Sequence, residues 1–257
     1  MVKSFFKRKT TVIIPCQDRV VAATRRGRNI LRKEIPLAPD TIKPEPFSRN
    51  ILSPAYDEAI KTLKNNGMSE GRITLVLPDG AYFLTFLELA DLPADPIERK
   101  QMVLFYMKKR FQSKGEILVA EQPLSEGKIL VAVASRENID SYLKPFRNLR
   151  LKVSSVKPAV VSALNFFLSK YGYDFFIFVI FFEKRIVFLG IKDGYPVIYR
   201  ALREPHTRYE FEEELSLVTK FLGGEPQTYG CGVAPYDFKG EIIDEDCIEL
   251  IINGELL

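Results

Sequence analysis

The chain of 257 residues contains one histidine and three cysteines, and this scarcity excludes several kinds of site. His206 has no obvious partner in the sequence, so neither a histidine-based catalytic triad nor a multi-histidine metal site is expected. Cys16, Cys231 and Cys247 are scattered and form no CxxC or Cys/His spacing, which argues against a zinc site and a disulfide framework. Reduced, mostly buried thiols are typical of a cytosolic protein.

Long apolar runs and the common phosphate-binding loops are also missing. The stretch Phe175 to Phe182 is the one run that invites a membrane interpretation, but eight residues fall well short of the roughly 20 that a bilayer helix needs. We expect it to be a buried central strand. Residues 1 to 9 are basic but lack the apolar region of a signal peptide, so we expect a soluble, cytoplasmic chain. There is no GxxxxGK loop and no GxGxxG after a strand, which removes the common nucleotide-binding motifs.

The net charge of +4 hides an asymmetry along the chain. Residues 1 to 35 hold ten lysines and arginines against two acids, whereas residues 204 to 257 hold thirteen acids against three bases. The basic end suits an anionic membrane surface or nucleic acid, and a solvated tail is the alternative. The aromatic residues that nucleic-acid stacking needs cluster in a strand expected to be buried, so we expect no nucleic-acid partner.

One pattern occurs twice in the sequence: three strand-like segments joined by tight turns and followed by a helix. The first copy comprises residues 11–14, 19–23 and 29–36, and the second comprises residues 175–182, 185–191 and 195–202. After the second copy, Thr207 and Glu210 form a capping-box pattern, which predicts a helix that ends at Gly223. Two such units favour a two-lobed α/β protein with a cleft between the lobes, and chance similarity of two common β-meanders is the alternative.

The region between the copies has its own ββαββα pattern over residues 72–147, with predicted helix starts at Asp95 and Ser135. We expect this block to be a small subdomain inserted in the first lobe. The predicted division is residues 1–71 for the N-terminal part of the first lobe, 72–147 for the subdomain, and 148–257 for the return to the first lobe and the second lobe. We expect an apolar helix after Pro158, and strand and loop in residues 227–232 and 241–250 with no strong helix after them.

Two short segments resemble the PilM proteins of type IV pilus assembly. The first begins with LVLPD at residues 75–79 and continues through Phe83 to Leu89 and DLP at residues 91–93 to a capped helix, and the second is VSSVKPAVVSA at residues 153–163. Together with the strand order, the resemblance covers most of residues 10–232. It implies an actin-like fold with two ribonuclease H-like lobes and an inserted subdomain, as in actin and the division protein FtsA. The GspL cytoplasmic domain of type II secretion and the MshI-type pilus proteins share this relation and lack a working nucleotide site.

The resemblance also implies where a nucleotide would bind. Actin-type ATPases hold the phosphates with two glycine-containing hairpin turns, because only backbone with little side chain approaches an anion closely. Here both turns lack the expected Asp-Gly pair, the first has a proline, and bulky phenylalanines precede the second. The vestigial phosphate and adenosine positions are Gln17, Asp18, Glu183, Lys184, Gly230 and Gly232. Asp18 could approach a metal, and Arg19 or Lys184 could neutralise a phosphate; the alternative is that these are exposed turn charges.

We therefore expect a non-catalytic actin-like scaffold on the cytoplasmic side of the inner membrane, in a type IV pilus or type II secretion assembly platform. The resemblance implies a PilN-like partner, whose cytoplasmic tail would lie in a groove beside the inserted subdomain, and contacts with the assembly ATPase. No cofactor or metal is expected. The alternative is an ATP-binding switch or ATPase with Mg²⁺ at a divergent site. The sequence leaves open whether residue 257 is a natural end or precedes a transmembrane segment.

Overall fold

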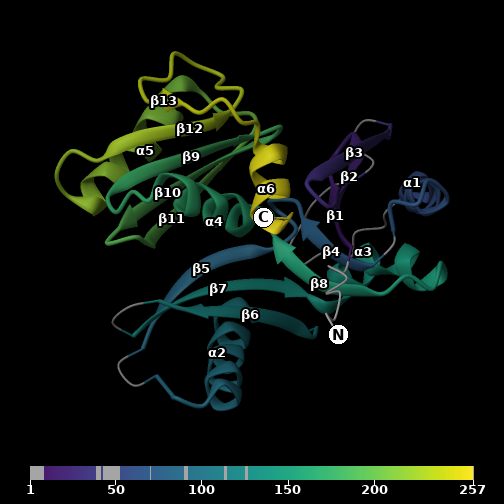
Figure 1. Ribbon diagram of the computed structural model, residues 1–257. Helices are drawn as coiled ribbons and strands as arrows, with labels where there is room; N and C mark the ends of the chain where they lie inside the picture. The colour runs from purple at the N-terminus through teal and green to yellow at the C-terminus, as the bar shows by residue number, and fades with distance from the viewer. Residues whose placement is uncertain are drawn as a thin grey trace, which may run out of the picture. The chain divides into compact units, whose positions relative to one another are not determined.

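The computed structural model describes residues 9–38, 42, 53–69, 71–89, 92–112, 115–124 and 127–256, and the chain divides into two compact units (Figure 1). Unit 1 comprises residues 1–82, 135–162 and 252–257, and unit 2 comprises residues 83–134 and 163–251. Part of the basic N-terminal third, residues 1–8, lies outside the described residues. In the described part of the chain, no helix combines the length and the apolar character that crossing a membrane requires.

The main sheet of unit 1 has the strand order β3–β2–β1–β4–β8. Its strands are β1 (Thr10–Pro15), β2 (Arg19–Arg26), β3 (Asn29–Pro36), β4 (Arg72–Leu77) and β8 (Val153–Pro158). The first three strands pair antiparallel, whereas β4 pairs parallel with both β1 and β8. β1 is buried from Thr11 to Pro15, as expected of a central strand that is covered on both faces.

Unit 2 repeats this topology in a second sheet, with the order β11–β10–β9–β12–β13. Its strands are β9 (Phe176–Phe182), β10 (Arg185–Lys192), β11 (Tyr195–Arg203), β12 (Gln227–Gly232) and β13 (Glu241–Ile242). Three antiparallel strands are again followed by two parallel ones. The duplicated three-strand pattern is therefore confirmed. The apolar run before residue 182 is the central strand β9, which is buried along nearly all of its length.

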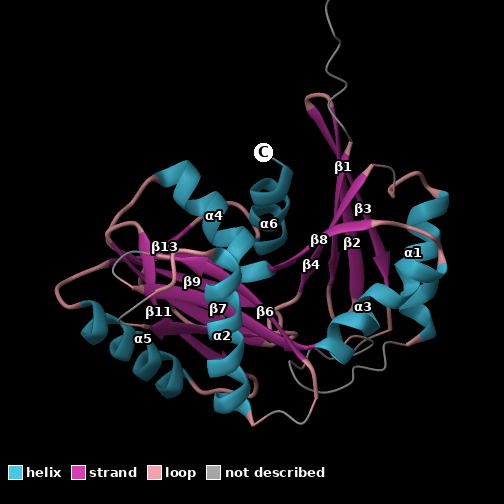
Figure 2. Cartoon of the chain, turned by 90° about the horizontal axis from the view of Figure 1, so that it is seen from below, coloured by secondary structure: helices cyan, strands magenta, loops and turns pink. Residues whose placement is uncertain are grey.

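A third, smaller sheet in unit 2 has the order β5–β7–β6. It contains β5 (Phe83–Glu88), β6 (Ile117–Pro123) and β7 (Lys128–Ser135), and α2 (Pro96–Phe111) packs on one face (Figure 2). Val103 and Met107 of α2 are buried in a cluster with Ile129 and Val131 of β7. Strand pairing corrects the expected content of the inserted block, because β4 lies in the sheet of unit 1 between β1 and β8. The boundaries 1–71, 72–147 and 148–257 otherwise stay a prediction.

Three helices begin at the caps that the sequence predicted. They are α2, α3 (Arg136–Asn148) and α5 (Arg208–Leu222). The other helices are α1 (Pro54–Asn65), α4 (Ala159–Tyr171) and α6 (Cys247–Leu256). Asp95 accepts a hydrogen bond from the backbone of α2, and Ser135 does the same for α3. Thr207 and Glu210 form the reciprocal capping box of α5. α4 follows Pro158 as expected, and its Phe167 stacks on Phe178 of β9 with 4.5 Å between ring centroids.

The C-terminal helix α6 was not expected, and the prediction of strand and loop after residue 241 is wrong beyond residue 246. Asp246 caps the helix, because its Oδ1 atom accepts a hydrogen bond of 2.6 Å from the backbone N–H of Glu249. Leu250 and Ile251 are buried. Tertiary burial of this apolar face stabilises a helix whose isoleucine content favours a strand locally.

Candidate functional site

Gln17 and Asp18 lie in unit 1, in the turn between β1 and β2. The turn is closed by a hydrogen bond of 2.8 Å from the backbone N–H of Cys16 to the carbonyl of Arg19. The Asp18 carboxylate accepts from Arg19 at 3.1 Å, and Arg19 also lies 3.5 Å from Glu34 on β3. Asp18 thus forms a local, partly exposed ion pair. The sequence left an exposed turn charge as the alternative to a metal-binding role for this residue.

Glu183 and Lys184 form the turn between β9 and β10 in unit 2. Lys184 lines an open pocket of about 620 Å³ together with His206 and Tyr236. The expectation that His206 lacks a partner is wrong. Its Nδ1 atom lies 3.0 Å from the Tyr236 hydroxyl oxygen, and that hydroxyl donates to the His206 carbonyl at 2.8 Å. Because the hydroxyl proton points to the carbonyl, Nδ1 is the donor in the first contact. His206 and Tyr236 therefore tie together two loops that line this pocket.

Gly230 and Gly232 lie on β12, next to the strand that leads into the Glu183–Lys184 turn. β12 pairs parallel with β9, and Gly232 is opposite Phe181. The structure therefore brings four of the six predicted positions to one end of the unit 2 sheet. Gly232 has φ of +94°, and an added Cβ atom there would lie 2.6 Å from the Phe181 carbonyl oxygen. Position 232 therefore requires glycine, both for its backbone conformation and for close packing.

Aromatic side chains fill the space beside Gly230. A Cβ atom added to Gly230 would lie 2.7 Å from Cε1 of Phe238 and 3.0 Å from Cε2 of Phe181. The Phe181 and Phe238 rings meet edge to face, with 5.4 Å between centroids, and both pack with Phe211 of α5. The absent side chain of Gly230 thus makes room for protein atoms. Packing explains this glycine without a nucleotide.

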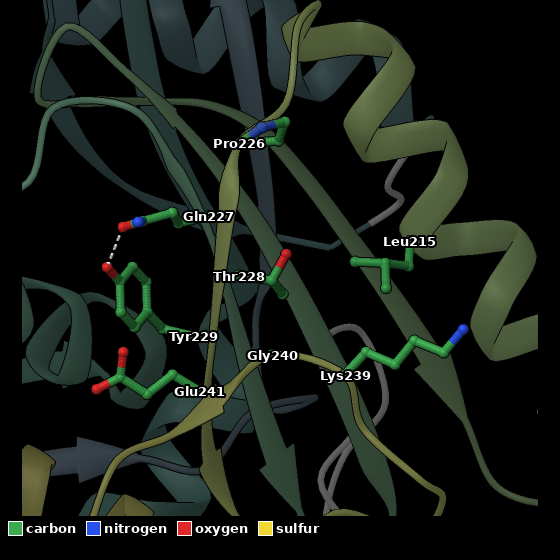
Figure 3. A pocket seen from close by; sticks show the side chains of 8 residues that line it. All are labelled: Leu215, Pro226, Gln227, Thr228, Tyr229, Lys239, Gly240 and Glu241. Carbon is green, nitrogen blue, oxygen red and sulfur yellow. Dashed lines mark hydrogen bonds between the residues drawn. The ribbon is translucent and has the colours of Figure 1, made fainter.

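A second pocket of unit 2, of about 370 Å³, lies beside β12 (Figure 3). Figure 3 shows Gln227, Tyr229 and Glu241 on one side of the strand and Thr228, Leu215 and Lys239 on the other. Tyr229 donates to Gln227 at 2.5 Å and stacks on Tyr173 with 4.9 Å between centroids. Burial, followed by a hydrogen bond with Tyr173, raises the pKa of Tyr229 to about 12. A tyrosine with a raised pKa is a weak acid, and Figure 3 shows the polar side chains of this pocket on both sides of the strand.

Two of the three cysteines lie together in the interior of unit 2. The sulfur atoms of Cys231 on β12 and Cys247 on α6 are 3.1 Å apart, and both residues are buried. The hydrogen bond with Cys247, together with burial, raises the pKa of the Cys231 thiol far above its ordinary value. A thiol with a raised pKa is a poor nucleophile. Within the described ranges, no group of three or more His, Cys, Asp or Glu side chains could hold a metal ion.

No family model matches the chain, and no curated protein matches it in sequence. Many solved structures resemble it, among them the following three. The PilM–PilN type IV pilus biogenesis complex contains a chain with a TM-score of 0.66 at 14% identity, over 87% of this chain and 81% of that one. The cytoplasmic domain of EpsL, an inner-membrane component of the type II secretion system of Vibrio cholerae, has a TM-score of 0.62 at 9% identity, over 96% and 94%.

The third is a Bacteroides thetaiotaomicron protein with an actin-like ATPase fold and unknown function. Its TM-score is 0.59 at 10% identity, over 91% of this chain and 86% of that one. At such low identity these similarities establish the fold, and this chain has the actin-like ATPase fold. The expected fold class is confirmed, and the resemblance to proteins of pilus assembly and type II secretion is confirmed at the level of fold.

Proposed function

We propose that this chain is a non-catalytic actin-like scaffold of a type IV pilus or type II secretion assembly platform, and that it binds the cytoplasmic tail of a PilN-like bitopic protein. One observation carries the proposal. Phe238 and Phe181 fill the space beside Gly230, the glycine that a nucleotide site would use for close approach. A protein that keeps the actin-like sheets but covers this part of β12 with its own side chains would retain a binding platform without phosphate chemistry.

The chemistry of the other predicted positions supports a non-catalytic role. Neither hairpin turn contains the glycine that lets backbone N–H groups surround an anion. The Asp18 carboxylate, the candidate metal ligand, is paired with Arg19. His206 is hydrogen-bonded to Tyr236, and the contact with Cys247 and burial raise the pKa of the Cys231 thiol. These contacts are consistent with roles of both residues in the fold.

The similarity and an exposed sheet edge support a tail-binding role. The similar PilM chain was solved in a complex with PilN. In unit 1, β3 forms the edge of the sheet, and its residues are largely exposed. An extended peptide adds to such an edge through main-chain hydrogen bonds. The scaffold would lie peripherally at the inner membrane on its cytoplasmic side, with the assembly ATPase as a further partner.

The partner proposal is tested by chemical crosslinking of the tagged full chain in its own cells. We expect a single-span inner-membrane protein of a pilus or secretion system to be crosslinked, and a synthetic peptide of its cytoplasmic tail to bind the purified chain. A scrambled peptide of equal composition is the control. Failure of every such tail to bind better than its scrambled form would overturn the proposal.

The alternative function is an ATP-binding switch, and one observation favours it. Lys184 lines the open pocket at the end of the unit 2 sheet, close to the strand that carries Gly230 and Gly232. In that alternative, Lys184 would neutralise a phosphate near Gly230 and Gly232. A ligand-dependent gain in stability, described at the end of the Discussion, separates the two functions.

A further inference from the structure

The helix α2 has an outward face that carries large aromatic side chains. Val103 and Met107 bury the inner face of the helix against the β5–β7–β6 sheet (Figure 2). On other faces, Phe105 is 65% exposed and Tyr106 is 41% exposed, and their rings meet edge to face with 5.9 Å between centroids. A phenylalanine this exposed in the middle of a helix contributes nothing to the core, and such exposure marks an interaction site when polar groups surround it.

Lysines surround these aromatic rings. α2 contains five basic residues and one acid, Glu98. Two of the basic residues are used within unit 2, because Arg99 pairs with Glu121 at 2.9 Å and Arg110 donates to Thr85 at 3.2 Å. Lys100, Lys108 and Lys109 are exposed and form no ion pair with a described residue. Lys108 and Lys109 follow Phe105 by three and four positions, so they flank it on the helix surface.

We propose that this basic–aromatic face, made of Phe105, Tyr106, Lys108 and Lys109, docks on a bilayer surface that contains anionic lipids. Phenylalanine and tyrosine insert at the headgroup level, and lysines reach the lipid phosphates along their long alkyl stems. An acidic protein also complements the charge, but the cores of protein interfaces are depleted in lysine. The proposal extends the proposed scaffold function, and it rests on that function for which membrane is bound.

A second helix of the same unit shows that exposed aromatics alone do not define this face. On α5, Tyr209 is 73% exposed and Phe221 is 61% exposed. The sequence of α5 contains four glutamates against one arginine and one lysine, so an anionic bilayer would repel it. Tyr209 therefore provides a control, because it is as exposed as Phe105 and because Glu212 and Glu213 follow it by three and four positions on the helix surface.

The test is sedimentation of the full chain with vesicles at low ionic strength. Vesicles of phosphatidylcholine with about one-third phosphatidylglycerol are compared with vesicles of phosphatidylcholine alone. We expect binding to the anionic vesicles only, and a loss of about fivefold per lysine in Lys108→Gln/Lys109→Gln. Phe105→Ala should also weaken binding, whereas Tyr209→Ala should bind like the unchanged chain. Unchanged thermal unfolding of each variant confirms that it is folded.

Three results would overturn the proposal. The first is no binding of the unchanged chain to anionic vesicles. The second is a loss confined to Arg26→Gln/Arg28→Gln, which would assign the attraction to the turn between β2 and β3. The third is binding to polyglutamate but not to vesicles, which would assign the face to an acidic protein. None of these assays uses a tail peptide or nucleotide, so their failure is distinguishable from failure of the scaffold function.

Discussion

Gly230 is the residue at which a packing role and a nucleotide-binding role make different demands. Its missing side chain leaves room for Phe238 and Phe181. A Cβ atom added at Gly230 would lie only 2.7 Å from the Phe238 ring and 3.0 Å from the Phe181 ring. The sequence indicated a glycine pair at residues 230 and 232 but not the ring that covers it. Phe238 is distant in sequence from Phe181, and such contacts follow only from the completed fold. The bond between His206 and Tyr236 was missed for the same reason.

We predict that Gly230→Ala lowers the free energy of unfolding by about 1–3 kcal/mol, because the added methyl group overpacks the aromatic cluster. Phe238→Leu should relieve part of this loss. A double-mutant cycle measured by urea unfolding should give a coupling free energy of about 0.5–3 kcal/mol. Gly115→Ala is the matched control, since no atom lies within 4 Å of its added Cβ. Equal stability of Gly230→Ala and Gly115→Ala would contradict the packing role.

Among the elements, strands and caps were the most predictable and the C-terminal helix was the least. Thr207 and Glu210 predicted the start of α5, because a capping box depends only on hydrogen bonds between residues three positions apart. α6 carried a comparable signal in Asp246 and Glu249, but its run of isoleucines favoured a strand. Strand β4 was predicted as a strand but placed in the wrong sheet, because sequence periodicity does not say which strands pair.

The segment before α6 is tied to α4 by an ion pair between Glu245 and Lys170. The hydrogen bond from Lys170 lowers the pKa of Glu245 below its ordinary value. A carboxyl group with a lowered pKa in the folded state adds stability above its unfolded pKa of about 4.3, and that stability is lost as the pH falls through the folded value.

We therefore predict that Glu245→Gln lowers the urea midpoint at about pH 7, and that the difference from the unchanged chain disappears as the pH falls well below about 4. Glu212→Gln is the control, because Glu212 pairs with Arg208 at a more exposed site, where both side chains are more than half exposed. We expect a smaller effect from it. A Glu245→Gln effect that is constant from neutral to acid pH would show that the carboxylate charge is not its cause.

At the scale of the whole molecule, the duplicated topology was predictable and the binding partner was not. The two main sheets have the same arrangement of three antiparallel and two parallel strands, and the sequence showed the antiparallel triplets directly as repeated turns and apolar segments. The parallel strands β4 and β12 lie far along the chain from β1 and β9, with which they pair, and local periodicity does not identify such partners. Partner choice depends on exposed surfaces such as the basic–aromatic face, which leave no periodic pattern.

Thermal unfolding of the purified chain with and without saturating Mg-ATP tests the scaffold function most directly. A ligand at 100 times its dissociation constant adds about 2.7 kcal/mol of stability, which corresponds to a rise of roughly 5 to 10 °C in the unfolding temperature. Mg²⁺ without nucleotide is the control. We predict no shift beyond that control. A shift of that size that disappears in Lys184→Ala would contradict the scaffold function and establish a nucleotide switch.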